Sequence, residues 1–181
     1  MLNFMKKILS LSRRAGRRKK HQYWFGEWEI FHWDKDGGLK SHEIIRNALA
    51  DEGEELMLDV FFRNAYQGSF YLGLCGGTPT DTTTLATLQG EPSGNGYSRQ
   101  EIERSSTGWP DLEQHEGDFR VKSKLVTFQA SGGAIGPVTN MFLTDVASGT
   151  SGNFIAWAAL SQERTIEDGE SLGCKIFIKA K

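Results

Sequence analysis

Residues 136–161 read GPVTNMFLTDVASGTSGNFIAWAALS, and this stretch decides the fold class. It contains two apolar runs, 136–146 and 153–161, which are separated by the small and polar residues ASGTSG. Short runs rich in Val, Ile, Phe and Trp, bounded by glycine and serine, are typical of buried strands. The short connection between them predicts a hairpin.

Similar patterns before and after this hairpin predict further strands. Gly, Pro, Asn, Asp and Thr separate the apolar or alternating segments, which are 69–75, 97–105, 119–131 and 171–181. The second of these segments alternates charged side chains and reads as a solvated edge strand. Two polar stretches, 76–96 and 107–118, predict exposed loops, and the length of the first favours a binding or assembly role.

A helical segment is expected ahead of these strands. Ser41 is a suitable N-cap, and apolar residues at helical spacing from Ile44 to Leu49 predict a helix over about 42–51. After a break at Gly53, a second apolar set predicts a helix over about 54–64. We therefore expect a mainly β fold, an antiparallel β-sandwich of the jelly-roll or immunoglobulin-like kind, preceded by a short helical segment and a basic N-terminal arm.

The charge of the chain is divided unevenly along its length. The 181 residues carry a formal net charge of −2, but residues 1–20 hold eight Lys and Arg and no acid. The other residues therefore hold 13 basic and 23 acidic side chains, a net charge of −10. Two cysteines and four histidines are too few for a disulfide scaffold or a cysteine-rich zinc module. No apolar run approaches the roughly 18 residues that a membrane-spanning helix needs.

The first 20 residues, MLNFMKKILSLSRRAGRRKK, combine an apolar stripe with a basic cluster. Phe4, Ile8 and Leu11 recur at the spacing of an amphipathic helix, with Met5 and Leu9 beside them. The basic cluster consists of Arg13, Arg14, Arg17, Arg18, Lys19 and Lys20. Such a segment favours docking on an acidic protein surface or on nucleic acid. A solubilising tail and a targeting or membrane role are the alternatives.

Residues 21–40 are rich in aromatic side chains, including Trp24, Trp28 and Trp33. Aromatic residues at this density are typical of anchors in a core or an interface, because each buries a large area. A surface that stacks on sugar rings is the alternative. We therefore divide the chain into a basic and Trp-rich anchor, 1–40, and a body of helix and β-sandwich, 41–181. The body is expected to fold without residues 1–33.

The search for a catalytic or metal site is negative. The chain has no GxxxxGK, HExxH or GxSxG motif. Glu113, His115, Glu116 and Asp118 lie close together, but their flanking residues favour a solvated loop. The segment 34–38, DKDGG, lacks the acidic residue that closes a calcium loop and predicts a turn.

The two cysteines are the remaining candidates for chemistry. Cys75 and Cys174 lie in apolar strands and are expected to be buried free thiols, with a bridge between them as the alternative. We expect no catalytic residue, cofactor or metal, and hence no enzyme.

Several short motifs follow one another along the body. Leu56, Asp59 and Phe62 come first, then YLGL at 71–74 and Thr78-Pro79. GYSRQ at 96–100, VTF at 126–128, GPV at 136–138, FLTD at 142–145 and a turn at 168–170 follow. This order is similar to that of small β-sandwich virion proteins of tailed bacteriophages, which include tail-fibre-like, head-decoration and neck proteins. The resemblance covers about 55–180 and implies a structural role without catalytic residues.

We therefore expect a structural subunit of a bacteriophage virion, in the head decoration, the neck or collar, or the head–tail region. Its partners would be other virion proteins, such as capsid, portal, neck or tail, and copies of itself, with assembly in the bacterial cytoplasm and no membrane contact. The residues assigned to partner binding are Arg13, Arg14, Arg17, Arg18, Lys19, Lys20, Trp24, Trp28 and Trp33. An adhesive, carbohydrate-binding module of a tail or fibre is one alternative, and a nucleic-acid-contacting protein is another.

Overall fold

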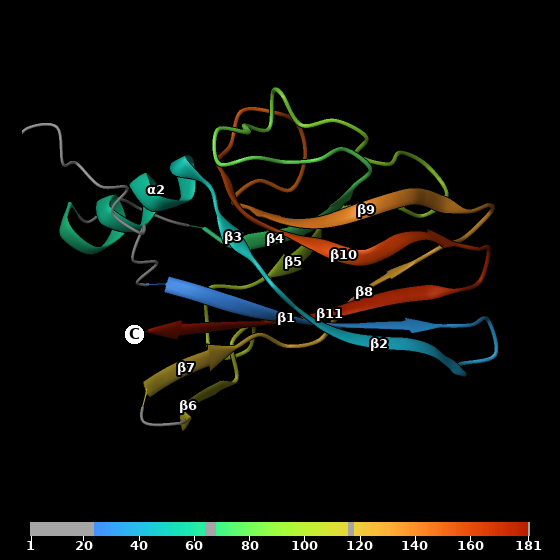
Figure 1. Ribbon diagram of the computed structural model, residues 1–181, viewed down its shortest axis with the longest axis horizontal. Coiled ribbons are helices and arrows are strands. Elements are labelled where there is room, and N and C mark those ends of the chain that lie inside the picture. The colour runs from blue at the N-terminus through green and yellow to red at the C-terminus, as the bar shows by residue number, and fades with distance from the viewer. Residues whose placement is uncertain (1–23, 64–67, 116–117, 181) are drawn as a thin grey trace, which may run out of the picture.

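Two antiparallel β-sheets pack face to face, as Figure 1 shows. The computed structural model describes residues 24–63, 68–115 and 118–180. Every strand pairing within these residues is antiparallel. The predicted mainly β sandwich is therefore confirmed.

The six-stranded sheet, which we call sheet A, is ordered β2-β1-β11-β7-β6, and β8 also pairs with β11. Its strands are β1 (Trp24–Trp33), β2 (Leu39–Arg46), β6 (Asp111–His115), β7 (Asp118–Lys122), β8 (Val126–Gln129) and β11 (Ser171–Ala180). Strands β7 and β8 follow one edge of β11 in succession. Between them, the hydroxyl of Ser123 accepts a hydrogen bond of 2.8 Å from the backbone N–H of Ile176. The strand predicted over 119–131 therefore exists in two pieces.

The five-stranded sheet, sheet B, is ordered β3-β10-β9-β4-β5. Its strands are β3 (Ala48–Leu49), β4 (Phe70–Cys75), β5 (Gln100–Ile102), β9 (Ile135–Thr144) and β10 (Phe154–Ile166). The hairpin predicted from residues 136–161 is the pair β9–β10 at its centre. Strand β5 lies at an edge, as expected for this segment, although its neighbour Arg99 is buried.

Side chains from the facing sides of both sheets form the main core. Sheet A contributes Trp28 and Ile30 from β1, and sheet B contributes Leu72 and Leu74 from β4, all with at most 1 % of their surface exposed. Burying a side chain of this size stabilises a fold by about 1.5–3 kcal/mol. Strand β1 is thus an integral part of the body.

The N-terminal part of the chain does not divide at residue 40. Strand β1 pairs with β11 over residues 24–33 and with β2 on its other side. A body without residues 1–33 would lack a strand from the interior of sheet A together with Trp28. The folded body therefore begins at or before Trp24 rather than near residue 41.

The helix predicted over 42–51 is wrong, because residues 39–46 form strand β2. Exposure alternates along this strand, so that Ser41, Glu43 and Ile45 face inward while His42 and Ile44 face outward. The segment also contains β-branched isoleucines, which favour a strand where a neighbouring strand is free to pair. Strand β1 supplies that neighbour.

The second predicted helix is confirmed as α2 (Asp51–Phe62), which begins three residues earlier than expected. Gly53 does not break this helix but lies inside it. A Cβ at this position would collide with the backbone carbonyl oxygen of Ile155 in β10. The glycine therefore permits the close approach of α2 to sheet B.

Of the two predicted exposed loops, 76–96 is confirmed as a loop and 107–118 is not. Residues 76–96 contain no strand or helix, but Leu85 reaches a small second core and is 3 % exposed. The predicted loop 107–118 is wrong over residues 111–115, because β6 forms there and pairs with β7. Cys75 and Cys174 are both buried and free, as expected.

Candidate functional site

The six predicted partner-binding basic residues, from Arg13 to Lys20, lie outside the described residues. Trp24 opens β1 and pairs through its backbone with Ala180. The structure thus describes the N-terminal part of the chain from Trp24 onward, but not the basic cluster. The binding role of these residues stays a prediction.

The other two predicted tryptophan anchors lie on opposite faces of β1. Trp28 points between the sheets and is wholly buried, so its position does not fit a contact with a partner. Trp33 lies on the outer face of sheet A and is partly buried. The two predicted anchors therefore differ, since Trp28 is a core residue and Trp33 a surface residue.

The outer face of sheet A carries a stack of three rings. The rings of Phe31 and Trp33 are 5.3 Å apart with an interplanar angle of 13°, and those of Phe31 and His42 are 4.7 Å apart at 16°. The ammonium group of Lys175 lies 5.6 Å from the centre of the Phe31 ring. Trp33 also extends over Gly173, where a Cβ would come within 2.6 Å of its indole. The arrangement places three nearly parallel, offset-stacked rings next to a cation.

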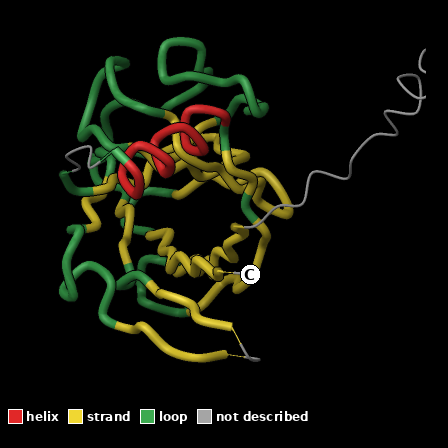
Figure 2. The backbone as a smooth tube through the Cα atoms, turned by 90° about the vertical axis from the view of Figure 1, so that its left-hand side faces the viewer, coloured by secondary structure: helices red, strands yellow, loops and turns green. Residues whose placement is uncertain are grey.

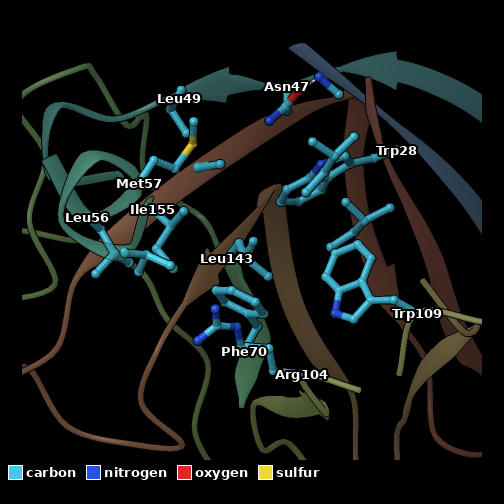
Figure 3. Close-up of a pocket in the computed structure, with 15 residues that line it drawn as sticks. Trp28, Asn47, Leu49, Leu56, Met57, Phe70, Arg104, Trp109, Leu143 and Ile155 are labelled. Atoms are coloured by element: carbon cyan, nitrogen blue, oxygen red, sulfur yellow. Dashed lines mark hydrogen bonds between the residues drawn. The ribbon is translucent and has the colours of Figure 1, made fainter. Parts of the chain in front are cut away.

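An apolar cavity of about 410 Å³ lies between the sheets at the end that carries α2. Figure 3 shows Leu49, Leu56 and Met57 on one side and Trp28 and Trp109 on the other. Its further lining residues are Gly26, Asn47, Val60, Phe70, Arg104, Leu143, Ile155, Ala156, Ile176 and Ile178. A concave site of this size and lining is typical of binding sites for apolar groups.

Few polar groups lie in the wall of this cavity. The backbone N–H of Gly26 donates a hydrogen bond of 2.6 Å to Oδ1 of Asn47. The indole Nε1 of Trp28 is buried and has no hydrogen-bond partner among the described residues. A buried donor without an acceptor is costly, by about 1–3 kcal/mol. Trp28 has no exposed surface, so this donor does not face the open space of the cavity.

Charged residues join β1 and β2 to the β10–β11 turn near the opposite end of β1. Nζ of Lys40 lies 2.6 Å from Oε1 of Glu170, whose other oxygen lies 2.9 Å from Nε2 of His32. The hydrogen bond from Lys40 lowers the pKa of Glu170, and burial lowers the pKa of His32. A neutral His32 beside an ionised Glu170 makes this a structural hydrogen bond. The imidazole is not positioned here as a base next to an open site.

The long 76–96 loop is tied to the body by a buried arginine. Nε and Nη2 of Arg99 donate to the two carboxylate oxygens of Glu91, each at 2.7 Å. The same guanidinium donates to the carbonyl oxygens of Val146 and Gly149 in the β9–β10 connection. The hydroxyl of Tyr97 donates to Glu91 as well, at 2.9 Å. This segment is therefore an ordered part of the surface.

Two kinds of site were sought among the described residues, a group of metal ligands and a membrane-spanning helix. The described residues contain no group of three His, Cys, Asp or Glu side chains placed to hold a metal ion. Glu113 forms an ion pair with Arg120 across β6 and β7, while Glu116 lies outside the described residues. In this part of the chain, the helical segment is too short and too polar to cross a bilayer.

Sequence reasoning missed both the cavity and the ring stack. The cavity depends on side chains from α2, both sheets and the loop before β6, and no local pattern connects these segments. The stack combines β1 with His42 of β2, which the sequence assigned to a helix. A correct prediction of β2 would have placed His42 opposite Phe31.

Comparison with known families identifies the folded body. The family described as Podophage GP4 fiber I protein gp80 matches residues 48–177, well over half of the chain. The chain belongs to this family. A search of curated proteins gives no match. The podophage fibre family confirms the expectation of a phage virion structural protein and supports a tail-fibre role, whereas it does not describe the expected head-decoration or neck protein.

Proposed function

We propose that the chain is a fibre subunit that attaches to the phage particle through the basic cluster Arg13–Lys20. The observation that supports this proposal is the position of the family match, which covers 48–177 and leaves the most basic part of the chain outside it. Strand β1 connects this part directly to the interior of sheet A. The body itself is acidic, so an acidic surface on another virion protein would attract the cluster and repel the body.

A complementation experiment tests this role in the phage that encodes the chain. The six basic residues are changed together to Gln, and incorporation into particles is measured by quantitative mass spectrometry. We expect near-complete loss of the subunit from particles, while Lys35→Gln with Arg46→Gln, two exposed changes on the body, leaves incorporation unchanged. Full incorporation of the six-residue variant would refute the anchoring role.

The partner of the cluster is proposed to be protein rather than packaged DNA, at the neck or head–tail region, with head decoration as the alternative position. Neutralising six phosphates would make DNA affinity fall by about 10³-fold or more between 50 and 200 mM salt. Binding to DNA with that salt dependence would support the nucleic-acid alternative instead. Antibody labelling of intact particles in the electron microscope would show the position. No catalytic role is proposed.

A second candidate function is glycan binding by the ring stack on sheet A. Sugar rings stack on flat aromatic surfaces, and Trp33, Phe31 and His42 supply nearly parallel rings. We expect Trp33→Ala to weaken binding of the protein to host surface glycans at least tenfold. Leu112→Ala, an exposed apolar change on β6, is the matched control. Equal binding by both variants would exclude this surface.

A further inference from the structure

The cavity between the sheets lies next to the point where the N-terminal segment leaves the body. Figure 1 shows α2, the start of β1 and the end of β11 at the same end of the sandwich. Gly26, two residues after the start of β1, is itself part of the cavity wall. The start of β1, which the N-terminal segment precedes in the sequence, therefore lies close to an apolar cavity.

The apolar wall of the cavity continues onto a strip of sheet A that sheet B does not cover. Ile178 of β11 lines the cavity and is paired with Val121 of β7, which is paired in turn with Leu112 of β6. Paired residues share one face of a sheet, so these three side chains form one row. Leu112 is 74 % exposed, and Phe119 on the same hairpin is 61 % exposed. Figure 2 shows this end of the sandwich, where the β6–β7 hairpin extends away from α2.

We propose that this cavity and strip bind the apolar stripe of the chain's own N-terminal segment, Phe4, Ile8 and Leu11. The stripe offers large apolar side chains at a spacing that suits a groove in the helix-in-groove mode of recognition. The proposal goes beyond the anchoring role, which concerns the basic cluster alone.

The length of the connection permits this docking within one chain. Twelve residues separate Leu11 from Trp24, and a segment of that length spans at most about 40 Å. This reach exceeds the width of a 410 Å³ cavity several times. A short tether also gives the segment an effective concentration in the millimolar range, which favours its own body over a second copy.

Charge favours the same occupant. Helix α2, which supplies Leu56, Met57 and Val60 to the cavity, contains five acidic residues and no basic residue. The first 20 residues contain eight basic residues and no acidic one. Arg104 is the basic residue among the lining residues, so the charge beside the cavity is mainly acidic and favours the basic N-terminal segment over an anionic lipid. The interaction should therefore weaken as salt is added.

A crosslinking experiment on the full chain tests the contact directly. Ile8→Cys is combined with Val60→Cys, and mild oxidation is followed by non-reducing electrophoresis and mass spectrometry. We expect an intramolecular disulfide in most molecules, and a much lower yield when Ser10→Cys replaces Ile8→Cys as the control. Disulfide-linked dimers in place of monomers would assign the cavity to a second copy and would overturn the proposal.

A dye-binding experiment provides a second measurement that does not disturb the fold. Ile8→Asp and Ser10→Asp are compared in the full chain with a dye that fluoresces in apolar cavities. Removing one buried apolar side chain should shift the docking equilibrium about tenfold, so Ile8→Asp raises the dye signal and Ser10→Asp does not. Identical signals from the two variants, together with equal crosslinking yields, would overturn the proposal. Both variants retain the six basic residues, so this failure would leave the anchoring role untouched.

Discussion

A buried ion pair between the two sheets stabilises the sandwich, and we expect its loss to be among the most destabilising polar changes. Nη2 of Arg164 in β10 lies 2.5 Å from Oε1 of Glu43 in β2. Arg164 also donates to the hydroxyl of Ser41, and Glu43 accepts from the backbone N–H of Ser161. The two charged side chains are only 5 % and 13 % exposed, so each partner depends on the other for compensation of its charge.

The expected magnitude follows from this burial. Removing one member of a buried ion pair costs about 3–5 kcal/mol, because the remaining charge is left without a partner. Glu43→Gln should therefore lower the free energy of unfolding by about 3 kcal/mol, since Gln can still accept one hydrogen bond. Arg164→Met should cost a similar amount. The double variant Glu43→Gln with Arg164→Met removes both charges and should cost much less than the sum of these two single changes.

Urea unfolding followed by circular dichroism measures these differences. The exposed ion pair between Asp59 and Arg63 on α2 is the matched control, and Asp59→Ala should cost less than about 1 kcal/mol. The reasoning would be refuted if changes at Glu43 and Arg164 were additive within about 0.5 kcal/mol. Additivity would mean that the two side chains do not stabilise each other, whatever their distance.

The same pair makes stability depend on pH in a defined direction. Burial raises the pKa of Glu43, but hydrogen bonds from Ser161 and Arg164 outweigh it and hold the pKa below its usual value. A lowered carboxyl pKa stabilises the folded state above the pKa of the unfolded chain, and this contribution is lost as pH falls through the folded value. The difference between the wild type and Glu43→Gln should therefore be largest at neutral pH and shrink in acid.

Three further predictions concern the cysteines, the helix and the N-terminal strand. Burial raises the pKa of Cys75 to about 12 and that of Cys174 well above its usual value, so neither thiol should react with a maleimide at pH 8 until the protein is unfolded. Gly53→Ala should destabilise the fold in thermal melting, because the collision with β10 outweighs the roughly 1 kcal/mol that alanine gains over glycine in a helix. Deletion of residues 1–22 should preserve the melting transition, whereas deletion of 1–33 should abolish it by removing β1. Rapid labelling of the folded protein would contradict the first expectation. A higher melting temperature of Gly53→Ala would contradict the second, and a folded 34–181 fragment would contradict the third.

The sequence was most informative where local pattern and tertiary role agree. The hairpin β9–β10 has apolar runs bounded by glycine and serine, and both strands lie in the interior of sheet B. Trp28 and Ile30 alternate with Phe31 and Trp33, and the two sets occupy opposite faces of β1. In such segments the hydrophobic period alone determines which side is buried.

The predictions from sequence were wrong where a neighbouring strand determines the conformation of a segment. The stretch from Ser41 to Leu49 has a suitable cap and apolar residues at helical spacing. However, residues 27–33 of β1 offer an edge whose backbone groups a strand over 39–46 satisfies. Strand β6 was missed for the same reason, since its polar residues form a strand only because β7 lies beside it. Such pairings join distant segments, and a single sequence does not reveal them.

The position of β1 also bears on how a fibre subunit could withstand force at its attachment. Residues 24–33 pair with 171–180 in one unbroken register, and β2 lies on the other side. A load applied to the N-terminal segment and resisted at the far end of the body, where the 34–38 turn lies, would act along the strand. The backbone hydrogen bonds between β1 and its neighbouring strands would then bear the load together, so they would not break one after another. Trp28 adds a wholly buried side chain that must leave the core before the strand can slide. If the basic cluster is the attachment, the resistance of the body to that load is therefore determined within the core of the sandwich.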